Sequence, residues 1–117
     1  MQYLLLIYDA EKALAALPEA EQQQIHTDYV TFTKEINASG HNKGGDALQP
    51  VHTATTVRVR DGKLAITDGP FAETREQLGG YYLIEAKDLD EATQIAARIP
   101  SAKYGSIEIR PVMGFQV

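Results

Sequence analysis

The chain contains no cysteine and has fewer basic than acidic residues, and these two features exclude several kinds of site. Without cysteine there is no disulfide framework, no thiolate metal site and no Cys nucleophile. The 11 Lys and Arg residues stand against 16 Asp and Glu, which gives a formal net charge of −5. Clustered Lys and Arg usually hold phosphate backbones, so we expect no nucleic-acid partner.

The chain also lacks a long hydrophobic run. Its most apolar opening stretch, residues 3–8, is too short to span a bilayer, and it has neither the basic flank nor the cleavage site of a signal peptide. No repeat or linker divides the 117 residues, of which 44% are apolar and 23% charged, as in an average globular protein. We therefore expect one cytoplasmic domain, residues 1–117, with no membrane contact.

Metal and cofactor motifs are missing as well. His26, His41 and His52 include no pair at the i, i+4 spacing of a helical metal site, and no carboxylate cluster completes a ligand set. Gly79-Gly80 precedes a predicted strand instead of a helix, so it does not suit a phosphate and more simply allows a bulge or a close backbone contact. We expect no metal and no cofactor.

Hydrophobic periodicity predicts five strands and a short sixth. Residues 3–8 and 80–86 are apolar on both faces, which is typical of central strands. Residues 55–60 and 63–67 alternate around an Asp61-Gly62 turn and predict a hairpin. Residues 106–112 alternate again, and residues 44–48 form a weak strand.

Two helices are predicted between these strands. One begins at Pro18, ends at Ser39-Gly40 and carries an apolar stripe of helical period, made of Ile25, Tyr29, Phe32 and Ile36. The other begins at Asp88, which with Glu91 resembles a capping box, and ends before Pro100. The order β-α-β, hairpin, β-α-β predicts an α+β fold of the ferredoxin-like (split βαβ) type with an extra β-hairpin.

The apolar hairpin positions suggest self-association. Val57, Val59, Leu64 and Ile66, with Ile107 and Ile109, offer more inward apolar positions than two helices cover. Burying the second face of the sheet against another copy is the simplest solution, so we expect a homodimer.

The connection at residues 67–76 is the most distinctive segment. It holds three acids, a Gly69-Pro70 kink and Phe71, where a plain hairpin would need only a short polar turn. Together with residues 3–8, 53–62, 77–84, 97–100 and 110–113, it resembles the DGPF branch of the YCII-related family along the whole chain. The resemblance implies a dimeric α+β barrel type of assembly whose paired sheets enclose clefts.

The resemblance to the YCII members proposed to be enzymes is incomplete. Those members carry a His on the first helix and an Asp in an Asp-Pro pair at the end of the second. Here Tyr29, not His26, stands nearest the first position, and Ile99-Pro100 stands at the second. The expected His-Asp pair is absent.

The candidate site residues therefore come from the connection and its neighbours. Asp68 and Glu73 are candidates for an acid/base pair in a cleft, where their like charges would raise one pKa. Asp68 can equally close an Asx-turn and only shape the corner. Candidate ligand-binding residues are Tyr29, Arg58, Phe71 and Tyr82, although Phe71 also suits a packing anchor that Pro70 turns into the core.

Three functions remain open. The chain is predicted to be an accessory, regulatory or small-ligand-binding module. Within the DGPF branch this resembles proteins found beside extracytoplasmic-function sigma factors, which implies a sigma factor as partner. The alternatives are a small-molecule enzyme using Asp68 and Glu73, and a dimer with no chemistry of its own.

Overall fold

The computed structural model describes residues 1–114, and its elements follow the predicted order. The helices are α1 (Glu11–Ala15), α2 (Glu19–Ala38) and α3 (Leu89–Ala97), with 3₁₀ turns η1 (Val51–Thr53) and η2 (Pro100–Lys103). The strands are β1 (Gln2–Asp9), β2 (Asn42–Ala47), β3 (Thr55–Arg60), β4 (Lys63–Asp68), β5 (Gln77–Glu85) and β6 (Ser106–Pro111).

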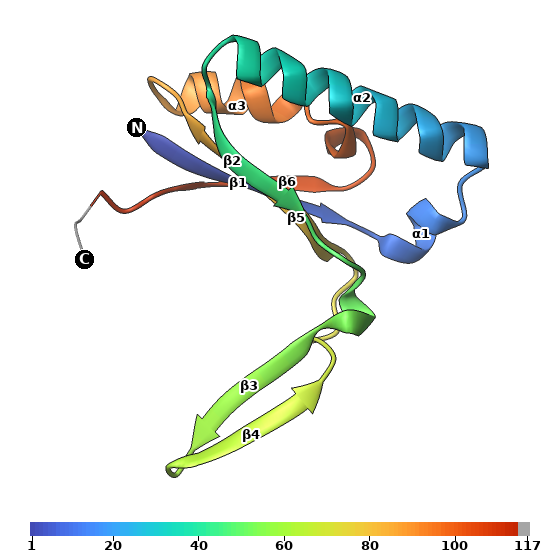
Figure 1. Cartoon of the computed structure of the whole chain (residues 1–117), viewed down its shortest axis with the longest axis vertical. Helices are drawn as coiled ribbons and strands as arrows, with labels where there is room; N and C mark the ends of the chain where they lie inside the picture. Colours follow the sequence, from blue (N-terminus) through green and yellow to red (C-terminus); the bar gives the residue numbers. More distant parts are fainter. Residues whose placement is uncertain (115–117) are drawn as a thin grey trace.

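Four strands form the main sheet, in the order β2-β5-β1-β6. The pairs β1/β5, β1/β6 and β2/β5 are all antiparallel. The two strands that are apolar on both faces, β1 and β5, lie in the centre, as predicted. Helices α2 and α3 lie together on one side of this sheet (Figure 1). The chain is thus a mixed α/β protein with antiparallel sheets.

The core lies between the helices and the main sheet. Side chains of β1 alternate, so that Tyr3, Leu5 and Ile7 are buried toward the helices. The helices and the other strands complete the core with Phe32, Ile36, Ile84, Ala86, Ala92, Ile95, Ala96 and Ile99. Leu4 and Leu6 point to the opposite face and are only half-buried. One face of the sheet is therefore packed and the other is left without a cover in the single chain.

The hairpin β3-β4 forms a separate sheet that extends away from the body (Figure 1). Val57 pairs with Ile66 and Val59 with Leu64, and all four side chains are 58% to 64% exposed. The radius of gyration is 16.3 Å, against about 13 Å for a compact domain of this length. The expectation that these four positions point inward is wrong for the single chain, whereas Ile107 and Ile109 do pack against the core.

The connection after the hairpin also differs from the prediction. Phe71 was expected to turn into the core, but its side chain is 78% exposed, so that prediction is wrong for the single chain. The corner is held to the start of β3, because the Gly69 amide donates to Ala54 O at 2.7 Å and Thr56 Oγ1 donates to Gly69 O at 2.8 Å. Fixed there, the corner follows the hairpin and carries Phe71 away from the body.

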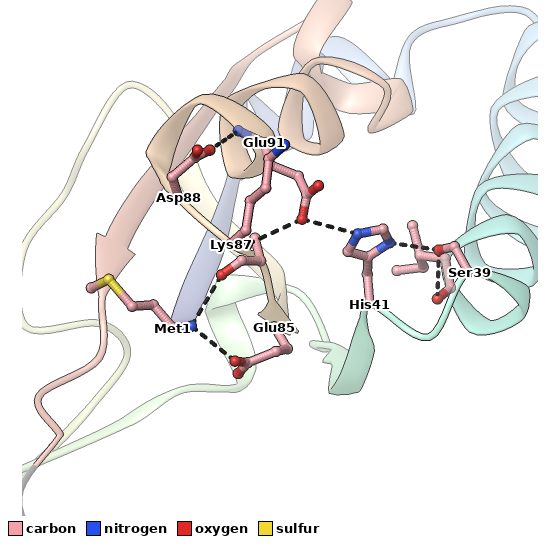
Figure 2. Close-up of polar contacts among 9 residues, drawn as sticks. Met1, Ser39, His41, Glu85, Lys87, Asp88 and Glu91 are labelled. Carbon is pink, nitrogen blue, oxygen red and sulfur yellow. Dashed lines mark hydrogen bonds and ion pairs between the residues drawn. The ribbon is translucent and has the colours of Figure 1, made fainter.

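The start of α3 confirms the predicted cap. Asp88 Oδ1 accepts the Glu91 amide at 2.9 Å, and Glu91 Oε1 accepts the Lys87 amide at 3.1 Å (Figure 2). The Lys87 amide, together with His41, holds the pKa of Glu91 below its usual range. His41 Nε2 lies 3.1 Å from the same Oε1, which ties the turn after α2 to the beginning of α3.

Gly105 lets η2 approach β1. Its amide donates to Ser101 O at 2.8 Å, and a Cβ at this position would overlap Tyr8 O and lie 2.8 Å from Asp9 Oδ1. We expect Gly105→Ala to lower the free energy of unfolding by about 1–3 kcal/mol, because the backbone must move to admit the methyl group. Urea unfolding measures the change.

Gly114→Ala is the matched control, since a Cβ there meets nothing within 4 Å. An equal loss of unfolding free energy in both variants would contradict the close contact at Gly105.

Candidate functional site

A cavity of about 430 Å³ lies between α2 and the helix-covered face of the sheet. Its size is that of a site for a small organic molecule. The lining combines apolar side chains, glycines and a few polar groups: Ile7, Asp9, Leu14, Ile25, His26, Tyr29, Thr33, Asn42, Gly45, Asp46, Ala47, Gly79, Gly80, Tyr81, Tyr82 and Ser101.

Glycines form the sheet side of this cavity. A Cβ at Gly45 would lie 2.5 Å from Tyr81 O, and one at Gly80 would lie 2.9 Å from Asp46 O, so only glycine lets β2 and β5 pair here. The register between β1 and β5 shifts at Gly79, which confirms the predicted bulge or close contact at the Gly79-Gly80 pair. At these positions the sheet contributes backbone without a side chain of its own to the cavity lining.

The polar end of the cavity is built from three elements. Asp9 ends β1, Ser101 belongs to η2 and Tyr29 to α2. Ser101 Oγ donates to Asp9 Oδ2 at 2.8 Å and lies 2.5 Å from the Tyr29 hydroxyl. Asp9 is only 8% exposed, and its Oδ1 has no hydrogen-bond partner. A buried carboxylate therefore lies at the edge of the cavity, with its Oδ2 bonded to Ser101 and its Oδ1 enclosed beside Gly105.

Burial controls the protonation of this group. It raises the pKa of Asp9, and the Ser101 hydrogen bond opposes the rise only in part. Burial likewise raises the pKa of Tyr29 to about 12, so the phenol keeps its proton at neutral pH. When Ser101 donates to Asp9, Tyr29 is the donor to Ser101. The three groups then form a chain of hydrogen bonds in which each donor points toward Asp9.

Two of the predicted ligand-binding residues, Tyr29 and Tyr82, lie on this cavity. The Tyr82 hydroxyl lies 2.7 Å from Thr33 Oγ1, and its ring meets Phe32 edge-on at 5.3 Å between centroids. The structure thus brings both tyrosines together at one site, and their contact with a ligand stays a prediction.

The other predicted residues lie elsewhere. Asp68, Glu73 and Phe71 are exposed, and neither they nor Arg58 lines the cavity. The single chain does not enclose Asp68 and Glu73 in a cleft, and their role in catalysis stays a prediction. Within residues 1–114 the Asp68 carboxylate accepts no backbone hydrogen bond, so the Asx-turn explanation finds no support either.

The sequence reasoning missed Asp9 and Ser101. Asp9 could have been found, because it continues the two-residue alternation of Tyr3, Leu5 and Ile7 and must therefore point toward the helices. Ser101 gave no such signal, since a serine after Pro100 is typical of a simple turn.

Metal and membrane features are absent from the part of the chain that the structure describes. Residues 1–114 contain no group of three His, Cys, Asp or Glu side chains placed to hold a metal ion. Within the same residues no helix is long and apolar enough to cross a membrane.

Comparisons with known proteins agree with the sequence resemblance. An uncharacterized protein of Rhizobium meliloti strain 1021 is 35% identical over 114 residues, which cover 96% of this chain and 92% of that protein. The solved structure of 5-chloro-2-hydroxyhydroquinone dehydrochlorinase from Burkholderia phenoliruptrix AC1100, in complex with 2,5-dihydroxybenzoquinone, is similar with a TM-score of 0.56. That likeness covers 97% of this chain and 94% of the enzyme at 13% identity, and it shows a shared fold alone. The family model of the YCII-related domain matches residues 1–116, and the chain therefore belongs to the YCII-related family.

Proposed function

We propose that this protein binds a small, ring-sized organic molecule in the cavity beside α2 and exchanges a proton with it. The observation that carries the proposal is the hydrogen-bonded chain from Tyr29 through Ser101 to the buried Asp9 carboxylate, three residues that line a cavity of about 430 Å³. Titratable groups with shifted pKa values in a cavity are typical of functional sites.

The hydrogen-bond chain gives a route for the proton. When a bound hydroxyl gives its proton to the Tyr29 oxygen, the Tyr29 proton passes to Ser101 Oγ and the Ser101 proton passes to Asp9 Oδ2. The ligand is left as an oxyanion and Asp9 becomes neutral. The raised pKa of Asp9 makes it a better proton acceptor than an exposed carboxylate.

The solved structure of similar fold supports a ligand of this size. That protein is a dehydrochlorinase of a chlorinated hydroxyhydroquinone, and its structure contains a dihydroxybenzoquinone. We propose a ligand of comparable dimensions for this chain, and the cavity volume is sufficient for one aromatic ring with its substituents.

The other predicted functions fit the cavity to different degrees. A small-ligand-binding role matches the cavity directly, and an enzymatic role would use Asp9 where the sequence suggested Asp68 and Glu73. Membership of the DGPF branch, a cytoplasmic location and a sigma-factor partner remain predictions from the sequence. The cavity is a feature for a small molecule rather than for a protein partner.

The pH dependence of stability tests the buried carboxylate. Because the pKa of Asp9 is raised in the folded protein, the folded state binds this proton more tightly than the unfolded chain. The contribution of Asp9 to the free energy of unfolding is therefore greatest below the ordinary Asp pKa and is lost as pH rises through the raised value. Asp9→Asn cannot ionise, so we expect it to gain stability relative to the wild type above this range.

Urea unfolding of both proteins from about pH 3 to about pH 8 measures the difference. Asp28→Asn, on the same helix as Tyr29 but outside the cavity, is the control and should follow the wild type. Curves for Asp9→Asn and wild type that run parallel over the whole range would contradict the shifted carboxylate.

We also propose that two copies pair through the hairpin, in the ferredoxin-like, dimeric α+β barrel arrangement. The supporting observation is the row of Val57, Val59, Leu64 and Ile66 on one face of β3-β4, each more than half exposed. A two-stranded hairpin is only marginally stable in water without a packing partner. The half-buried Leu4 and Leu6 of the uncovered sheet face offer an apolar surface on the second copy.

Val59→Asp tests this pairing. A charge in the apolar row should convert the assembly to single chains, whereas Ala65→Asp, which points to the other face of the hairpin, should leave it intact. Light scattering at about 10 µM reports the mass of the assembly. Stable symmetric pairs normally persist at this concentration. A wild type with the mass of one chain, 12.9 kDa, would refute the pairing.

A further inference from the structure

We propose that Ser39, His41 and Glu91 form a second site, at which the Ser39 hydroxyl accepts an acyl group from activated esters. None of these three residues lines the cavity beside α2, so this site is independent of the proposed function. The site depends on the distances among the three side chains, on the tautomer of the imidazole and on the exposure of the hydroxyl.

Ser39 and His41 meet because the chain reverses directly after α2. Gly40 has a φ of 81°, a left-handed conformation that glycine adopts without strain, and it turns His41 back toward Ser39. Ser39 Oγ lies 2.7 Å from His41 Nδ1, and His41 Nε2 lies 3.1 Å from Glu91 Oε1 (Figure 2). A hydroxyl, an imidazole and a carboxylate in this order are the arrangement of an activated nucleophile.

Glu91 sets the tautomer of His41. Its Oε1 also accepts the Lys87 amide at 3.1 Å, which holds the carboxylate in place. An ionised carboxylate can only accept, so His41 Nε2 carries the proton and Nδ1 of the neutral ring has the free lone pair. Ser39 Oγ then donates to Nδ1 at 2.7 Å, in preference to its other acceptor, Ile36 O, at 3.2 Å. The base and the nucleophile are thus in the protonation states that attack requires.

The three groups suffice for both steps of an ester hydrolysis. When Ser39 Oγ attacks the ester carbonyl, its proton passes to His41 Nδ1, the bond to the leaving oxygen breaks, and that oxygen takes the electron pair and then the proton. The charge that forms on His41 lies beside Glu91 and at the C-terminal end of α2, which both favour a cation. Water then attacks the acyl carbon, and His41 passes the proton of the water to Ser39 Oγ as the acid leaves.

The backbone around Ser39 limits the reaction to esters with good leaving groups. Ser39 is exposed and the His41 side chain is 28% exposed, so an ester in solution can reach them. The Ser39 amide donates to Glu35 O at 3.0 Å and the Gly40 amide to Asn37 O at 3.1 Å, so neither amide serves an oxyanion. A missing oxyanion donor typically costs about 100-fold or more in rate. We therefore assign aryl esters and similar acyl donors to this site, and not amides.

The aryl ester p-nitrophenyl acetate tests the site in the intact chain. We expect release of p-nitrophenol and, in samples quenched with acid, an acetyl group on Ser39 within the tryptic peptide of residues 35–43. Ser39→Ala and His41→Gln should each lower the rate of release at least about 10-fold, because a positioned general base contributes this much or more. An NMR spectrum with the wild-type pattern verifies the fold of each variant.

Ser106→Ala and His52→Gln are the matched controls. Ser106 Oγ donates to Glu76 Oε1 at 2.8 Å, so this serine has a carboxylate beside it where Ser39 has an imidazole. His52 is an exposed histidine of η1, outside the proposed site. Both variants should keep the wild-type rate of release.

Two outcomes of the ester experiment would overturn the proposal. An unchanged rate in Ser39→Ala would show that an imidazole hydrolyses the ester without the serine. Acetyl groups on lysines and none on Ser39 would show unspecific acylation. Either result leaves the cavity and its chain of hydrogen bonds untouched.

The tautomer of His41 tests the role of Glu91 as a positioning residue. ¹⁵N NMR of the neutral imidazole should find the proton on Nε2, and Glu91→Gln, which can donate as well as accept, should weaken this preference and lower the ester rate. A proton on Nδ1 in the wild type would contradict donation by Ser39 and overturn the proposal.

Discussion

Burial of the Asp9 carboxylate is the constraint on which the candidate site depends. The alternation of β1 sends every second side chain toward the helices, and after Tyr3, Leu5 and Ile7 the next such position is an acid. Only one of the two Asp9 carboxylate oxygens has a hydrogen-bond partner, because Ser101 donates to Oδ2 while Oδ1 stays unpaired. The same burial raises the pKa of Asp9, a residue that lines the cavity.

The chain has a closely packed region and a region whose apolar side chains have no packing partner in the single chain. The helices and one face of the main sheet form a closed core, and the cavity lies at its edge beside α2. The hairpin β3-β4 leaves apolar side chains exposed in the single chain, and those on the other face of the main sheet are half-buried. Stability of the body and the proposed pairing between copies therefore depend on different residues, and substitutions can separate them.

Periodicity predicted the strands, the two long helices, the central place of β1 and β5, and the capping of α3 by Asp88, because each is fixed by local spacing. It failed for Phe71, whose place follows from hydrogen bonds between Gly69 and the start of β3 that join residues distant in sequence. Tyr29 and Tyr82 line one cavity, and their role in ligand binding stays a prediction. Asp9 was not predicted as a site residue, although it continues the two-residue alternation of Ile7 in β1.

The most direct test of the central claim is a ¹³C NMR titration of the Asp9 side-chain carboxyl in the wild type. The midpoint should lie above the ordinary Asp value, because burial disfavours the ionised form more than the Ser101 hydrogen bond favours it. A midpoint at or below the ordinary Asp value would contradict the claim.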